Sequence, residues 1–211
     1  MTGRLESVMF RGPAGQLEGL WKEAVAPRRG GAVFAHPHPL YGGTLHNKVV
    51  YRAARAFSAC GWETLRFNFR GVGLSEGTHD EGRGETEDVR AALDVVESRT
   101  GRPLLAGGFS FGSAAALRAI RGDERVVAYV GVGFPAARAA ESGMSPPAVP
   151  SLFISGGGDT VAPPGPMREF VAGSAEVVVI PGADHFFAGR LPALEDAITA
   201  FLRNLPAAAV A

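Results

Sequence analysis

The fold of this 211-residue chain is decided by residues 104–117, LLAGGFSFGSAAAL. An apolar run ends in Gly108-Phe109-Ser110-Phe111-Gly112 and continues directly into an alanine-rich, helix-favouring segment. This order of strand, sharp turn and helix predicts a nucleophile elbow with Ser110 at its tip. Glycine on both sides fits this interpretation, because a serine in a strained turn brings backbone segments too close together for a Cβ atom.

The same G-x-S-x-G pattern occurs a second time, at Gly73-Leu74-Ser75-Glu76-Gly77. It continues into residues 78–82, a polar stretch with no helical period. An elbow needs a helix directly after its serine, so we interpret Ser75 as a turn residue in a loop. The pattern alone is therefore weak, and its context favours Ser110.

The segments around the elbow alternate between predicted strands and helices. Residues 5–11 and 16–23 predict a hairpin, because two breakers fall in the four residues between them. Further strands are expected at 31–35, 62–69, 104–109, 125–132, 151–154 and 176–180, and helices at 46–59, 85–98, 166–171 and 191–202, besides the elbow helix. This alternation predicts a single α/β domain over residues 1–211, with a mostly parallel, twisted sheet flanked by helices and an antiparallel start.

Composition restricts the class of protein and of partner. Lys plus Arg equals Asp plus Glu at 21 each, so nothing in the charge balance indicates a nucleic-acid partner. No stretch is apolar enough for a signal peptide or a membrane span, and we expect a cytoplasmic protein without membrane attachment. The one cysteine, Cys60, falls in a predicted helix and is interpreted as a buried structural thiol. The sequence is compatible with a homodimer but contains no exposed apolar segment that requires one.

Two residues elsewhere in the chain complete the chemistry that Ser110 needs. A serine hydroxyl becomes nucleophilic when an imidazole accepts its proton and a carboxylate orients that imidazole. Asp159 and His185 both follow predicted strands, and with Ser110 they occur in the order Ser, Asp, His that such folds use. Asp184 is a rival acid, but it adjoins His185 and cannot easily reach the required geometry. We therefore predict the catalytic triad Ser110, Asp159 and His185.

The loop after the strand at 31–35 is expected to stabilise negative charge on the substrate oxygen. Such an oxyanion hole needs two backbone N–H donors, and Phe111, directly after the nucleophile, supplies one. Proline has no N–H, so within His36-Pro37-His38-Pro39-Leu40 the second donor is Leu40, which we favour, or His38.

Neither a metal nor a cofactor is predicted. The spacing His36-x-His38 fits a metal pair, but no further cysteine or histidine cluster completes a coordination shell. Gly71-x-Gly73 follows a predicted strand as in a dinucleotide-binding loop, but the third glycine and the following helix are missing.

Four motifs spread over nearly the whole chain carry a family resemblance. Residues 36–43, 68–75, 108–112 and 182–187 read HPHPLYGG, NFRGVGLS, GFSFG and GADHFF. The sequence resembles small bacterial α/β-hydrolases of the dienelactone-hydrolase-like group, in the subgroup with a serine nucleophile. The resemblance implies the α/β-hydrolase fold, the triad named above and an oxyanion donor at Leu40. Dienelactone hydrolases themselves have cysteine where Ser110 stands, so their lactone substrate does not transfer.

Together these residues predict a carboxylesterase-like serine hydrolase that cleaves a small ester or thioester through an acyl-enzyme on Ser110. Residues 136–149 are the only place for a lid, and they are few and broken by Pro146-Pro147, so we expect minimal or no cap. The pocket is then shallow and open. Its expected aromatic lining is Tyr41, Phe109, Phe134 and Phe186. The alternatives are a peptidase or amidase, a C–C hydrolase with the same triad, and a non-catalytic protein that binds a small ligand on this fold.

Overall fold

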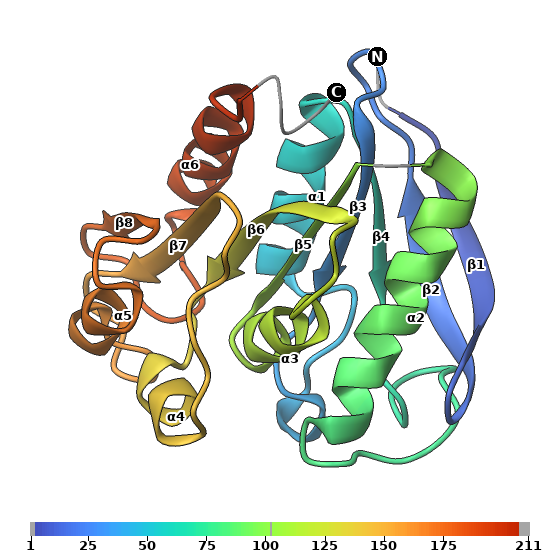
Figure 1. The fold of residues 1–211 in the computed structure, drawn as a ribbon, viewed down its shortest axis with the longest axis horizontal. Helices are drawn as coiled ribbons and strands as arrows, with labels where there is room; N and C mark the ends of the chain where they lie inside the picture. The colour runs from blue at the N-terminus through green and yellow to red at the C-terminus, as the bar shows by residue number, and fades with distance from the viewer. Residues whose placement is uncertain (1–2, 102, 207–211) are drawn as a thin grey trace.

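One eight-stranded sheet organises the computed structural model, which describes residues 3–101 and 103–206. The strands are β1 (Leu5–Gly12), β2 (Gly15–Lys22), β3 (Gly30–Ala35), β4 (Trp62–Phe67), β5 (Leu104–Phe109), β6 (Val126–Val132), β7 (Ser151–Gly156) and β8 (Glu176–Ile180). They lie in the order β1-β2-β4-β3-β5-β6-β7-β8 (Figure 1). Pairing is parallel from β4 through β8, and β2 is antiparallel to both its neighbours. The predicted mostly parallel sheet with an antiparallel start is confirmed.

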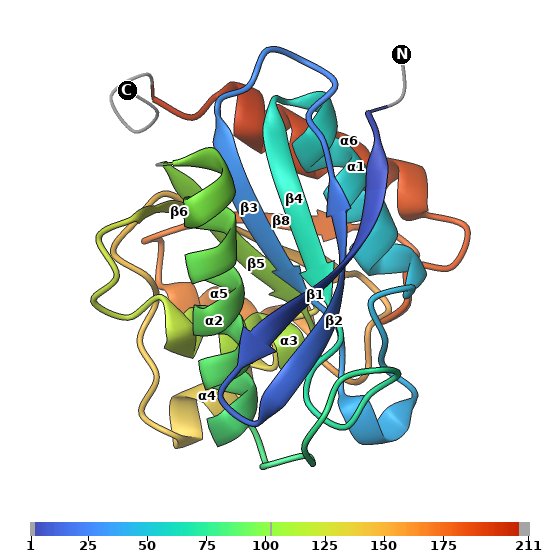
Figure 2. The same ribbon diagram turned by 90° about the vertical axis from the view of Figure 1, so that its right-hand side faces the viewer.

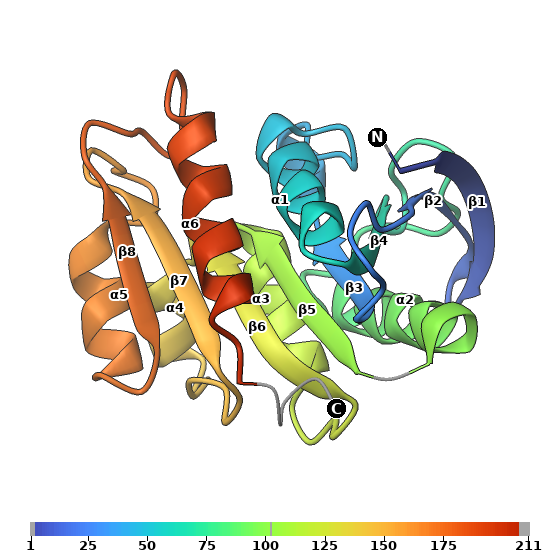
Figure 3. The same ribbon diagram turned by 90° about the horizontal axis from the view of Figure 1, so that it is seen from above.

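Helices cover both faces of the sheet (Figure 3). One face packs against α1 (Lys48–Ala59) and α6 (Leu191–Arg203). The other packs against α2 (Arg83–Thr100), α3 (Phe111–Ala119), α4 (Ala136–Glu141) and α5 (Pro164–Val171). Every residue of β3 and β5 is buried, which explains why these strands appear in the sequence as apolar runs without alternation.

The β1–β2 hairpin forms one edge of the sheet, and Figure 2 shows it twisted across the strands behind it. Its register runs from Leu5 opposite Lys22 to Gly12 opposite Gly15, which leaves only residues 13 and 14 in the loop. The predicted breaker stretch is therefore this turn together with the two residues that flank it.

The connection from β6 to β7 is the place where a lid could have been inserted. It contains only the six-residue α4, followed by an extended stretch that includes Pro146 and Pro147. The connection is too short to form a cap, as expected. Within the described ranges, no helix is both long and apolar enough to cross a membrane.

Candidate active site

Ser110 lies at the sharp turn between β5 and α3. Its φ of 53° and ψ of −121° place a non-glycine residue in a sparsely populated backbone conformation, which costs about 1–3 kcal/mol and persists only where surrounding structure enforces it. The Ser110 N–H donates to the Val132 carbonyl of β6 at 2.8 Å, and its carbonyl accepts from the Ser113 hydroxyl at 2.5 Å. The turn is thus held from both sides.

The two glycines of the elbow are required by packing. A Cβ atom on Gly108 would lie 2.5 Å from the Gly112 carbonyl oxygen and 2.6 Å from the Ser113 nitrogen. A Cβ atom on Gly112 would collide with the carbonyl oxygen of His36 at the end of β3. The steric role expected from the sequence is what the structure shows.

The three predicted triad side chains lie in a single hydrogen-bonded line. His185 Nε2 is 3.1 Å from Ser110 Oγ, and His185 Nδ1 is 2.7 Å from Asp159 Oδ2. Asp159 and His185 are both buried, whereas Ser110 is half-buried. Asp159 follows β7 and His185 follows β8, so the carboxyl ends of neighbouring parallel strands bring these residues together.

Backbone amides decide between the two candidate acids. The second oxygen of Asp159, Oδ1, accepts from the N–H groups of Val161 and Ala162, both at 2.8 Å, which fixes the carboxylate facing His185. Asp184 instead turns its Oδ1 toward its own loop, where it accepts from Phe186 at 3.1 Å and from Ala188. Asp184 therefore shapes the exit loop of β8 and does not contact the His185 ring.

His36 holds the loop after β3 against the end of β4. Its Nε2 accepts from the Phe69 N–H at 3.1 Å, and its Nδ1 lies 2.6 Å from the Pro37 carbonyl, so Nδ1 carries the proton. Burial lowers the pKa of His36 from 6.5 to about 4, so the ring is neutral at pH 7. Both ring nitrogens are occupied by backbone groups, which gives His36 a structural role.

The amide favoured as the second oxyanion donor is already engaged. The Leu40 N–H donates to His38 Nδ1 at 3.2 Å, an N-cap bond that starts the short 3-10 turn η1 (Pro39–Tyr41). The structure gives no hydrogen-bond partner to the His38 N–H within the described chain. Burial, and secondarily the neighbouring His79, lower the pKa of His38, which favours the neutral ring that can accept this bond.

A ring cluster beside this loop was not foreseen from the sequence. The His38 ring lies 4.8 Å from Phe111, 5.0 Å from His79 and 4.7 Å from Tyr41, measured between centroids. His79 Nδ1 lies 2.8 Å from Oε1 of the buried Glu85. His79 comes from the loop that contains the second G-x-S-x-G pattern, and no local sequence signal links it to His38.

The expected pocket aromatics fall into two groups. Tyr41 and Phe186 are 86% and 59% exposed, and Phe109 is buried beneath His185, with ring centroids 5.0 Å apart. Phe134 is instead a core residue, because its ring packs against Phe153 and Phe170 at 5.2 and 4.9 Å. Phe109 and Phe134 are thus both fully buried, and the expectation that these two rings line an open pocket is corrected.

Comparison with known proteins gives the chain's relatives. No protein-family model matches it. It is similar to a Xanthomonas campestris member of the α/β serine hydrolases without a lid, with 34% identity and a TM-score of 0.89 over 97% of this chain and 96% of that one. An α/β serine hydrolase homologue from Coxiella burnetii is 36% identical, with a TM-score of 0.88 over 98% and 99% of the two chains. An uncharacterized Rickettsia prowazekii protein is 31% identical over 94% of this chain and 89% of that protein.

The first two of these similarities exceed 30% identity and extend over nearly the full length of both chains. They agree with the sheet order, the strained serine turn and the hydrogen-bonded line of side chains described above. This chain belongs to the α/β serine hydrolase family.

Proposed function

We propose that the protein hydrolyses small esters or thioesters through a covalent acyl intermediate on Ser110. The observation that carries this proposal is the line from Ser110 Oγ through His185 to Asp159, with contacts of 3.1 and 2.7 Å. A base within hydrogen-bond reach of a nucleophile, itself oriented by a third group, is the arrangement that activates a serine. A protein that only bound a ligand would have no need for it.

In the proposed reaction Ser110 Oγ attacks the carbonyl carbon while His185 Nε2 accepts the hydroxyl proton. Asp159 holds the Nδ1 proton and stabilises the imidazolium that forms. When the tetrahedral intermediate collapses, His185 returns the proton to the leaving alcohol or thiol. Water then attacks the acyl-serine, with His185 as its base, and releases the carboxylic acid.

For the oxyanion hole we propose the Phe111 N–H together with the His38 N–H. Phe111 is the first residue of α3, where helix amides have no intrahelical acceptor. His38 is favoured over Leu40 because the Leu40 N–H already donates to His38 Nδ1. A crystal structure of a phosphonate adduct tests this choice: we expect the phosphoryl oxygen about 2.7–3.1 Å from both proposed amides. A phosphoryl oxygen within hydrogen-bond distance of the Leu40 nitrogen would instead make Leu40 the second donor, as the sequence predicted.

The open site supports a small substrate. The exposed ring of Tyr41 lies beside His38 and that of Phe186 beside His185, and no cap encloses these rings in the part of the chain that the structure describes. Short acyl groups can contact these rings without a closing lid. We propose that residues 1–211 act as one domain of the dienelactone-hydrolase-like group, on the motifs quoted above.

Intact-protein mass after incubation with a fluorophosphonate tests the nucleophile. We expect one adduct on the native protein, none on Ser110→Ala, an unchanged adduct on Ser75→Ala and greatly slowed labelling of His185→Ala. Folded native protein that remains unlabelled would contradict the proposal and would favour a non-catalytic protein that binds a small ligand at these residues.

A further inference from the structure

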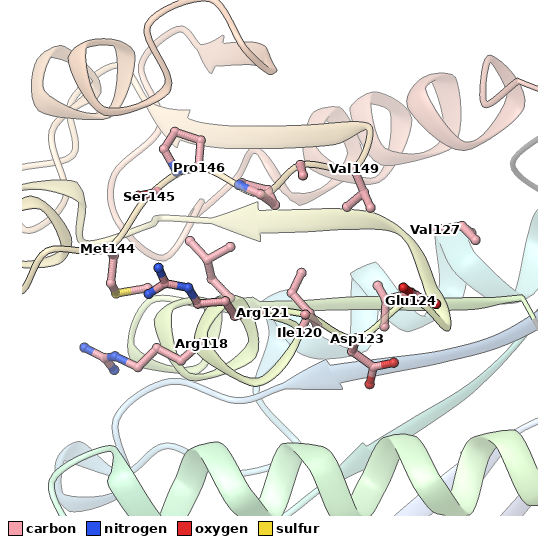
Figure 4. Close-up of a pocket in the computed structure, with 15 residues that line it drawn as sticks. Arg118, Ile120, Arg121, Asp123, Glu124, Val127, Met144, Ser145, Pro146 and Val149 are labelled. Atoms are coloured by element: carbon pink, nitrogen blue, oxygen red, sulfur yellow. The ribbon is translucent and has the colours of Figure 1, made fainter.

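A concave region lies on the α3 face, and the three triad residues do not line it. It is a groove of about 780 Å³ between the end of α3, the loop that leads to β6, and the extended segment from Met144 to Val149 (Figure 4). None of its lining residues belongs to the triad or to the loop after β3. The groove exists because α4 ends at Glu141 and the chain returns to β7 without a longer helix to fill the space.

The walls of the groove are mainly apolar. Leu117, Ile120 and Val126 belong to the hydrophobic core on this side of the sheet, and Met144 and Val149 pack against that core while remaining partly exposed. This open apolar concavity leaves Met144 and Val149 partly exposed to water, whereas Leu117, Ile120 and Val126 are buried. It therefore favours a ligand that carries an apolar segment.

Charge is distributed unevenly along the groove. Arg118 and Arg121 both extend toward the end at Met144 (Figure 4), and the structure pairs neither guanidinium with a carboxylate in the described chain. Asp123 and Glu124 lie farther along the groove, and Asp123 is bound by Arg125 at 2.7 Å. One end thus offers two unpaired guanidinium groups, and the rest offers an apolar channel.

We infer that this groove binds a carboxylate with an apolar tail, such as a medium-chain fatty acid. The carboxylate pairs with Arg118 and Arg121, whose planar N–H groups match its geometry, and the tail lies toward Val126 and Val149. A singly charged head is favoured over a doubly charged phosphate because Asp123 and Glu124 share the groove. This site does not depend on the proposed esterase activity.

Methyl NMR of [methyl-13C]methionine-labelled protein tests the inference. The chain has four methionines, of which Met144 lines the groove while Met9 lies exposed on β1 as an internal reference. Octanoate should shift the Met144 resonance saturably and leave Met9 in place. The double variant Arg118→Gln/Arg121→Gln should weaken octanoate binding about tenfold or more, because two charge-assisted hydrogen bonds are lost. Arg11→Gln, on the exposed side of β1, is the matched control and should bind as the native protein does.

A neutral ligand of equal length separates charge from apolar contact. 1-Octanol should bind the native protein more weakly than octanoate does. It should bind the double variant with the same affinity as the native protein. The inference is overturned if octanoate gives no saturable shift, if octanol binds as tightly, or if the double variant binds octanoate normally. A Met144 shift that follows protein concentration would assign the groove to a second copy of the chain and would also overturn it.

Discussion

The chain contains one five-residue pattern twice, and the two copies differ in which residues adopt positive φ values. At Gly108-x-Ser110-x-Gly112 the serine adopts the positive φ, while the glycines are required by close packing. At Gly73-x-Ser75-x-Gly77 the glycines adopt positive φ values of 58° and 84°, and the serine does not. The pattern thus describes two different turns.

The hydroxyl groups of Ser75 and Ser110 have different hydrogen-bond partners. Ser75 is 7% exposed, donates to the Asn68 carbonyl at 2.7 Å and accepts from the Glu18 N–H at 3.0 Å. Ser110 faces the ring of His185. The two copies thus differ in whether a helix follows the serine and whether an imidazole reaches it, and our proposal that Ser110 is the nucleophile depends on this difference.

Asp159→Asn should produce the largest effect, because it removes the charge that distinguishes the surroundings of Ser110 from those of Ser75. We expect kcat for a small ester to fall about 10³–10⁴-fold, since the imidazolium loses its partner and the ring loses its required tautomer. Asp184→Asn is the matched control and should stay within about threefold of the native rate. A loss below tenfold for Asp159→Asn would mean that another group orients His185.

Gly112→Ala should unfold the elbow, because the added methyl group collides with backbone at the end of β3. We expect the free energy of unfolding to fall by about 3 kcal/mol or more, measured from urea denaturation. Gly165→Ala in α5 is the control, since its Cβ meets nothing within 4 Å, and we expect a change from zero to about 1 kcal/mol of stabilisation. Equal stability of the two variants would refute the packing role of Gly112.

Mild acid should destabilise the Ser110 turn and the Ser75 loop together, because His36 lies between them. Its carbonyl abuts Gly112, and its ring accepts from Phe69 at the start of the Ser75 loop. The folded-state pKa of about 4 lies below the unfolded value of 6.5, so the unfolded chain binds the proton first and stability falls as pH falls between these values. We expect this group to contribute a loss of about 2 kcal/mol from pH 7 to pH 5.

Urea denaturation of the native protein and of His36→Gln at both pH values isolates this contribution. The glutamine variant lacks the titrating ring, so its stability should change less with pH than that of the native protein. Parallel pH dependence in the two proteins would show that His36 is not the group responsible.

Ser75→Ala should have the smallest effect. Removing a buried hydroxyl leaves the Glu18 N–H without its acceptor and should cost about 1–2 kcal/mol of unfolding free energy. Ester hydrolysis should stay within about twofold of the native rate. A larger loss of activity would show that the second pattern supports the site.

Local sequence predicted the order of elements well because each buried strand and each helix carries its own apolar pattern. Boundaries were less accurate: α1 begins at Lys48, two residues after the predicted start, because the Asn47 side chain caps it by accepting from Val49 at 2.9 Å. β7 continues to Gly156, two residues past the predicted end. Gly156 has no Cβ atom, and its backbone lies against the loop after β8, so the first glycine of a run that we interpreted as a loop belongs to the strand.

Chain order was enough to predict which side chains meet at the site, since parallel strands place their carboxyl ends together. Side-chain direction beyond a strand end was not predictable in this way. Phe134 turns into the core after Gly133, whose φ is 52°, and the ring of His38 takes the Leu40 amide. The direction of Phe134 follows the positive φ of Gly133, and that of His38 accompanies a local hydrogen bond; no sequence pattern indicates either.

The order of Ser110, Asp159 and His185 along the chain is also the order in which the ribosome synthesises them. His185 is 75 residues beyond Ser110, so at about 5–20 residues per second a ribosome adds it roughly 4–15 s after the serine. Asp159 arrives between them. On the proposed function, Ser110 is therefore made seconds before the base that would activate it, and we expect a nascent chain to become reactive only after β8 and the loop that contains His185 have joined the sheet.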